Sequence, residues 1–162
     1  QINFQMPHEA GGPAVAAIAV RRNTVAGDAV RVPVFAQQPG VFTLDGARGL
    51  VVHHADNTLV TAERPLRRGE FAYFFGTGLG AVTDPPPDGA PAPRQPLARV
   101  TGPVRVTLGG ADCEVLFAGL APDLAGVYQV NIRVGESVAS GEHGLVLTVG
   151  ETPGRAVRVP VE

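Results

Sequence analysis

The hexapeptide Ala-Val-Arg-Val-Pro-Val occupies residues 29–34 and recurs unchanged at residues 156–161, which lie 127 positions later. Its valines alternate with Arg and Pro, and this period of two is typical of a strand with one buried and one wet face. Proline has no amide hydrogen to donate to a neighbouring strand. We therefore expect Pro33 and Pro160 to lie in edge strands, or to turn the nitrogen toward solvent.

The duplication extends upstream of the hexapeptide. Residues 1–4 (QINF) resemble residues 129–132 (QVNI) in the same order relative to it. We interpret residues 1–34 as a copy of residues 129–161. The chain then reads as the tail of one unit followed by a second unit, which is the pattern of a slice through a tandem array.

Alternating apolar residues and Gly, Pro, Asp and Asn turns continue along the whole chain, and no ten-residue stretch carries a helical apolar stripe. We expect strands at 1–6, 14–21, 29–35, 40–44, 49–54, 57–61, 70–76, 103–108, 112–118, 127–134, 144–149 and 155–161. Many short strands at this spacing predict an all-β, immunoglobulin-like β-sandwich. A partial unit over 1–62 precedes a complete unit over 63–162, and a partial sandwich leaves an apolar face and a strand edge open.

The composition excludes several function classes. The chain has 162 residues with a formal charge of −2, which argues against nucleic acid as the main partner. All 13 basic side chains are Arg, so Schiff-base chemistry and Lys–Asn isopeptide staples are excluded. A single cysteine, Cys113, excludes an internal disulfide and a Cys-rich zinc site, and we expect it to be buried and inert. No apolar run is long enough for a membrane-spanning helix.

No motif predicts a catalytic residue, a metal site or a cofactor. The glycine-rich stretch 76–80 lacks the following helix of a phosphate site, so we interpret it as a turn or bulge where backbones pass closely. His53 and His54 are neighbours on a strand and point to opposite faces. We expect both to be solvated, with one of them pairing with Asp56. Calcium remains an alternative for the acidic residues Asp84, Asp88, Asp112, Glu114 and Asp123, although the usual loop spacing is absent.

Aromatic residues concentrate in the strand expected at 70–76. Phe71, Tyr73 and Phe75 share one face, while Ala72 and Phe74 share the other. Two apolar faces predict a central strand that is covered on both sides. The alternative is an aromatic platform for sugar rings, for which we name Tyr73 and Tyr128 as candidate ligand-binding residues.

Several ordered motifs together resemble a known family. They are FGTGLG at 75–80, PDGAPAP at 87–93, VRVTLGG at 104–110, LFAGLAP at 116–122, GVYQVN at 126–131 and PGVF at 39–42, with QINF at 1–4. Over nearly its whole length, the chain resembles the Solibacter-type uncharacterised C-terminal domain, which is repeated in secreted proteins of Acidobacteria. The resemblance implies an extracellular, bacterial β-sandwich appendage without an established catalytic mechanism. Cys113 departs from it, because a small residue such as Ala or Pro is expected there.

We therefore expect a non-enzymatic, extracellular structural module that self-associates by strand complementation, in a filament or surface layer. An adhesion or carbohydrate-binding module of a larger secreted protein, with a cell-surface glycan as partner, is the alternative. A passive spacer or sorting domain is the third interpretation. The anchors expected for self-association are Ile2, Phe4, Met6, Val30, Val32 and Val34.

Overall fold

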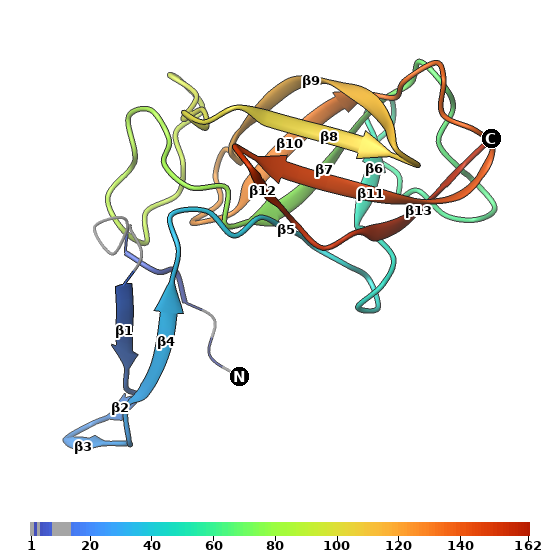
Figure 1. The fold of residues 1–162 in the computed structure, drawn as a ribbon. Helices are drawn as coiled ribbons and strands as arrows, with labels where there is room; N and C mark the ends of the chain where they lie inside the picture. The colour runs from blue at the N-terminus through green and yellow to red at the C-terminus, as the bar shows by residue number, and fades with distance from the viewer. Residues whose placement is uncertain (1, 3, 8–13) are drawn as a thin grey trace.

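The structure, a computed structural model, describes residues 2, 4–7 and 14–162. These residues form strands and contain no helix, so the predicted all-β class is confirmed. The strands are β1 (Ala14–Ile18), β2 (Arg21–Arg22), β3 (Val25–Ala26), β4 (Val30–Val34), β5 (Gly40–Val41), β6 (Val51–His53), β7 (Phe71–Thr77), β8 (Val104–Leu108), β9 (Ala111–Leu120), β10 (Tyr128–Arg133), β11 (Gly141–Val149), β12 (Thr152–Pro153) and β13 (Val157–Val161). Figure 1 shows that β5 to β13 build a sandwich and that β1 to β4 project from it as a separate hairpin.

One hydrogen-bonded path joins the sandwich strands in the order β12-β11-β8-β9-β10-β7-β5, with β13 beside β11 and β6 beside β7. The long strand β9 turns this path from one layer into the other. Its first residues pair with β8, and the segment from Glu114 onward pairs with β10. The register shifts near Leu116, because Asn131 pairs with Phe117 and Ile132 pairs with Val115. This extra residue is a β-bulge, which bends the strand and increases its twist.

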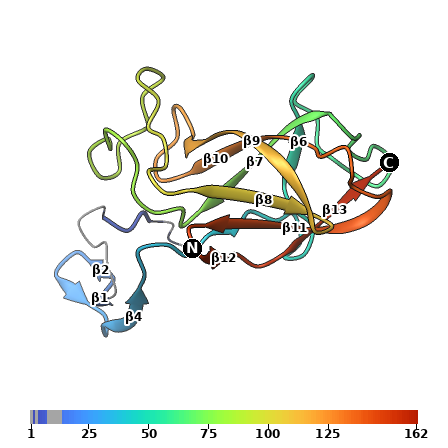
Figure 2. The ribbon, with the colours of Figure 1, turned by 45° about the horizontal axis from the view of Figure 1, so that its top comes forward.

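The far edge of β13 is closed by irregular segments rather than by a full strand. The amide of Gly49 donates to the carbonyl of Arg158 (3.0 Å), and the amide of Leu66 donates to the carbonyl of Pro160 (3.0 Å). These contacts give the sandwich a half-barrel character (Figure 2). Pro160 only accepts at this edge, through its carbonyl, while the amides of Arg158 and Glu162 on either side of it donate to the carbonyls of Ala47 and Leu66.

The core lies between the two layers and draws on residues from both sides of position 62. Val51 in β6, Phe74 in β7 and Leu147 in β11 are all fully buried and belong to one cluster. Both β5 and β6 pair with β7. The domain boundary expected after residue 62 thus falls inside this core, and the segment that stands apart is the hairpin of β1 to β4.

The glycine-rich stretch 76–80, at the end of β7, lies against the chain that leads from the hairpin into the sandwich. A Cβ atom on Gly78 would approach the carbonyl oxygen of Gln38 to 2.0 Å, and one on Gly76 would approach that of Gly40 to 2.6 Å. Gly78 also has a φ of +74°, a conformation that glycine adopts at no steric cost. The interpretation of this stretch as a site of close backbone approach is confirmed.

Strand β7 is not covered on both sides, and that expectation was wrong. Ala72 and Phe74 face the core and are buried. On the other face Phe71 is 48% exposed, while Tyr73 and Phe75 are half-buried. No second layer packs over this outer face in the described part of the chain.

Candidate functional site

The first candidate site is the projecting hairpin, which we call the arm and define as residues 14–34. In both views it extends from one end of the sandwich, while the C-terminus lies at the opposite end (Figures 1 and 2). β1 and β4 pair along its length, and β2 and β3 pair at its tip. Within the described residues, β1 and β4 have no other strand beside them, so both outer edges of the arm are unpaired.

The arm repeats the pairing of the C-terminal hairpin, residues 141–161, position for position. Ala16 pairs with Val32 in the arm, and the residues 127 positions later, His143 and Val159, pair in the C-terminal hairpin. All five pairs between β1 and β4 have such a counterpart between β11 and β13, from Ala14–Val34 and Gly141–Val161 to Ile18–Val30 and Leu145–Val157.

The tips of the two hairpins agree in the same way. Arg22 pairs with Val25 at one tip, and Val149 pairs with Thr152 at the other. The turn residue that follows is Asn23 with a φ of +55° in the arm and Gly150 with a φ of +58° in the C-terminal hairpin. The local fold of the hexapeptide hairpin is therefore the same twice.

The two hairpins differ strongly in burial. Val157, Val159 and Val161 are between 1% and 4% exposed. Their counterpart Val30 is 63% exposed, and Val32 and Val34 are half-buried. The valine side of the arm, continued by Ile18 at the end of β1 and by Val20 just after it, thus presents an apolar face that the described chain covers only in part.

Three neighbours cover the C-terminal hairpin, and the arm lacks all three. β8 pairs along β11 from Leu108–Leu145 to Val104–Val149. Leu66 is hydrogen-bonded along β13. The opposite layer, including Phe74 and Ile132, packs against its valines across the core. The arm therefore has the strands of a sandwich edge without the rest of a sandwich.

The remaining self-association candidates lie at the base of the arm. Ile2 and Phe4 are exposed by 66% and 61%, and Met6 is half-buried. A strand was expected at 1–6, but residues 2 and 4–6 are not in a strand. Phe4 and Met6 instead line a cavity of about 570 Å³ between the arm and the sandwich, together with Phe35.

The two tyrosines named as ligand candidates lie on opposite faces of the sheet and do not form one site. Tyr128 is 8% exposed and its hydroxyl donates to the carbonyl of Gly80. Burial raises the pKa of Tyr128. Tyr73 lies on the outer face, where its hydroxyl donates to the side-chain oxygen of Asn57 (3.0 Å).

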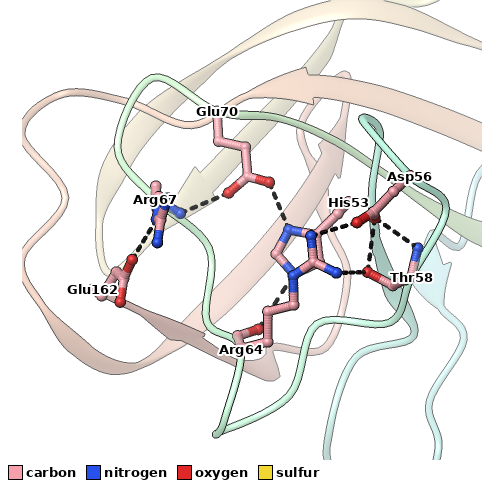
Figure 3. A network of polar contacts seen from close by, with 7 residues as sticks. All are labelled: His53, Asp56, Thr58, Arg64, Arg67, Glu70 and Glu162. Carbon is pink, nitrogen blue, oxygen red and sulfur yellow. Dashed lines mark hydrogen bonds and ion pairs between the residues drawn. The ribbon is translucent and has the colours of Figure 1, made fainter.

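A polar pair of a buried histidine and a half-buried glutamate, which the sequence analysis missed, lies at the loop between β6 and β7 (Figure 3). His53 is 2% exposed, so the expectation of a solvated side chain was wrong for this residue. Its Nδ1 atom lies 2.5 Å from Glu70 Oε1, and its Nε2 atom lies 3.3 Å from the carbonyl oxygen of Arg64. Both ring nitrogens thus contact protein atoms, and the contacts tie the loop to β6. We call the His53–Glu70 pair the clamp. The two partners are 17 and 11 positions away in the sequence, where no local pattern marks them.

Arg67 links the clamp to Glu162, which follows the C-terminal hairpin. The amide of Arg67 donates to Glu70 Oε2 (2.8 Å), and its guanidinium pairs with Glu162 (Figure 3). Asp56, which was expected to pair with a histidine, instead pairs with Arg64 at 2.5 Å. The side-chain hydrogen bond from Arg64, with those from Thr58, lowers the pKa of Asp56 to about 2.

Other candidate chemistry is engaged elsewhere or buried. Asp112 and Asp123, named for calcium, form ion pairs with Arg105 (2.6 Å) and Arg94 (2.5 Å). Cys113 is 6% exposed, and burial raises the pKa of its thiol, so little of it is the reactive thiolate at neutral pH. In the part of the chain that the structure describes, no three His, Cys, Asp or Glu side chains gather as metal ligands.

The described residues contain no helix with the length and apolar character needed to cross a membrane.

Comparison of the chain with family models, with curated proteins and with solved structures finds no match. The resemblance to the Solibacter-type domain stays a prediction.

Proposed function

We propose that the protein is a non-enzymatic, extracellular structural module that self-associates through its arm. The observation that carries this proposal is that the arm and the C-terminal hairpin have the same strand register, while only the C-terminal hairpin is buried. The hexapeptide identity and the matching registers also support the inference that residues 1–34 and 129–161 are two copies of one repeated segment. A repeated unit of an immunoglobulin-like sandwich would explain why the arm has a valine face ready for burial.

The driving force for association is the apolar face of the arm. Full burial of a Val or Ile side chain stabilises by roughly 1.5–3 kcal/mol. The face offers Ile18, Val20, Val30, Val32 and Val34. Association also costs several kcal/mol in lost translational and rotational freedom. We therefore expect a modest affinity, with a dissociation constant on the order of 1–100 µM.

The partner that fits this face best is the arm of a second copy. The arm could instead replace the C-terminal hairpin in the sandwich of another molecule. Arg22 would then occupy the fully buried position of Val149, its register counterpart. Burying an unpaired charge is costly. The arm of another molecule, in contrast, has the same free valine face and two free edges. Face-to-face packing closes a dimer, and edge pairing of successive arms extends into a filament.

The test is the mass of the full chain in solution as a function of concentration. We expect the weight-average mass in sedimentation equilibrium to rise above that of a monomer in the micromolar range. Val32→Asp places a charge on the valine face and should return the chain to a monomer. Val15→Glu is the matched control, because Val15 is on the opposite face of the arm and its counterpart is the exposed Glu142.

A chain that remains monomeric at several hundred micromolar, or that associates equally well with Val32→Asp, contradicts the proposal. Such a result would leave the carbohydrate-binding module and the passive spacer, the second and third interpretations of the sequence.

The alternative function, adhesion through a carbohydrate, is favoured by a different observation. The outer face of β7 carries Phe71, Tyr73 and Phe75 without a covering layer. This face is on the sandwich, so its function does not depend on the arm.

A further inference from the structure

A hollow of about 420 Å³ lies on the outer face of the sandwich, lined by His54, Phe71, Leu116 and Asn131 together with Ala72 and Ile132. Strands β7 and β10 pair beneath it, with Tyr73 opposite Asn131 and Ala72 opposite Ile132. We call it the outer hollow. Its volume is within the range of pockets that hold small ligands.

The hollow has one aromatic and one aliphatic wall, and both walls are available to a ligand. Phe71 is 48% exposed, and the guanidinium of Arg133 lies 6.0 Å from the centroid of its ring. Leu116 is 44% exposed because it is the extra residue of the bulge in β9. A bulge next to a binding site commonly aims a side chain that a regular strand would place elsewhere.

Two polar side chains, Asn131 and His54, also line the hollow. The side-chain oxygen of Asn131 accepts a hydrogen bond from Gln129 Nε2 at 2.8 Å, which orients the Asn131 amide. The NH₂ group of Asn131 has no protein partner among the described residues, so it is available as a donor. His54 is exposed, and its ring stands edge-on to Tyr73 with the centroids 6.3 Å apart. The hollow thus combines apolar walls with an oriented amide donor and an imidazole.

The charges around the hollow compensate one another. Arg133, beside Phe71, pairs with Glu136 at 3.4 Å and lies opposite Glu114 in the register of β9 and β10. No group of like charges therefore selects an anionic or a cationic ligand. The ligand that suits the walls and the donor is neutral, with one apolar face and hydrogen-bonding groups around its rim.

We propose that the outer hollow binds a pyranose ring of a neutral glycan. A pyranose has an apolar C–H face that packs against an aromatic ring, and hydroxyl groups that accept from an amide and exchange hydrogen bonds with an imidazole. A purely apolar ligand would leave the donor of Asn131 unpaired, which costs affinity. A protein partner needs a far larger contact, near 800 Å² on each side, than two exposed apolar side chains provide. Tyr73, the residue named from the sequence, acts here by positioning His54.

The test is affinity electrophoresis of the full chain through gels that contain neutral polysaccharides, namely a β-glucan, a xylan, a mannan and a starch. We expect at least one gel to retard the protein. Phe71→Ala and Asn131→Ala should each weaken that retardation by about tenfold, the effect of losing roughly 1.4 kcal/mol. Phe75→Ala is the matched control, because Phe75 is another aromatic residue of β7 on the same face but does not line the hollow.

The Val32→Asp chain separates this proposal from the proposal about the arm. Its retardation should equal that of the wild-type chain, whether or not it self-associates. Absence of retardation in all four gels overturns the proposal, as does retardation that Phe71→Ala leaves unchanged. NMR can also show whether N-acetyl-leucinamide binds at Leu116. Such binding, with no response to the four polysaccharides, would overturn the proposal in favour of a peptide partner.

Discussion

The arm and the C-terminal hairpin share a hexapeptide and a register, yet one is exposed and the other forms part of a core. Val159 is 1% exposed, and its counterpart Val32 is only half-buried. The difference shows that pairing within a hairpin is a local property, which alternation and the turn determine. Burial of the hairpin depends on what the rest of the chain brings to it.

The largest expected effect comes from the same substitution at the two counterpart positions. Val159→Asp buries a charge in the core and should reduce the free energy of unfolding by about 4 kcal/mol or more, which is enough to prevent folding. Val32→Asp should reduce it by less than about 1 kcal/mol in the monomer. Urea denaturation followed by circular dichroism measures both. Equal losses would show that the arm is buried in the monomer.

Hydrogen exchange should separate the two hairpins without any substitution. An isolated two-stranded hairpin is marginally stable in water, whereas core strands open only with global unfolding. In dilute solution we expect amides of β4 to exchange roughly 100-fold or more faster than those of β13. At high protein concentration, self-association should slow amide exchange in β4 and leave amide exchange in β13 unchanged. Protection of β4 that is the same at every concentration contradicts the proposed dimer.

The clamp of His53 and Glu70 holds the loop between β6 and β7 against the sandwich, and the arm has no comparable contact among the described residues. Glu70→Ala leaves the buried His53 without its carboxylate and frees the loop that reaches Glu162. We expect a loss of about 2 kcal/mol in unfolding free energy. Glu136→Ala removes a carboxylate from an exposed ion pair and serves as the control, with an expected loss below about 0.5 kcal/mol. Chemical denaturation at neutral pH measures the unfolding free energy of both variants. Equal losses in the two variants would contradict the structural role assigned to Glu70.

A smaller effect should follow when the arm is made more like its counterpart. Arg22→Val restores the apolar residue that Val149 supplies in the C-terminal hairpin. Because it extends the valine face and removes a positive charge, we expect self-association to strengthen about threefold to tenfold. Sedimentation equilibrium measures the change. An unchanged dissociation constant would place Arg22 outside the contact between copies.

The smallest expected effect is a pH dependence in the loop that holds the C-terminal hairpin. The pKa of Asp56 is lowered to about 2 by hydrogen bonds from Arg64 and Thr58. Its contribution to stability is present above the unfolded value near 3.9 and is lost as pH falls toward 2. NMR titration of the Asp56 carboxyl carbon should show the low midpoint, and Arg64→Ala should raise it. A midpoint near 3.9 in the wild-type chain would mean that the Asp56–Arg64 pair does not form.

Much of the fold was predictable because the valine alternation and the Gly and Pro turns are local signals. The strands around Val104, Val130 and Val157 lie where the alternation predicts them. The bounds were less predictable, since β9 extends to Leu120 and changes partner along its length. The strand expected at 57–61 is only a bridge at Leu59, because that segment follows β6 across a turn.

The candidate sites were predictable to different degrees. The valine face of the arm follows from the repeated hexapeptide, so Val30, Val32 and Val34 were named from the sequence. The outer hollow was not, because Leu116 of β9 and Phe71 of β7 line it from either side of β10, and a bulge decides where Leu116 points. An aromatic pattern alone had suggested that β7 is covered on both faces.

The sequence by itself determined that this chain is all-β and where most of its strands lie. It also determined that one hairpin occurs twice with the same strand register. These are properties of neighbouring residues and of turns, whose energies act over a few positions. Only the tertiary structure decided that one copy of the hairpin is buried and the other exposed, that His53 meets Glu70, and that β7 has an open face. Each of these depends on contacts between segments far apart in the chain, which no local pattern of residues encodes.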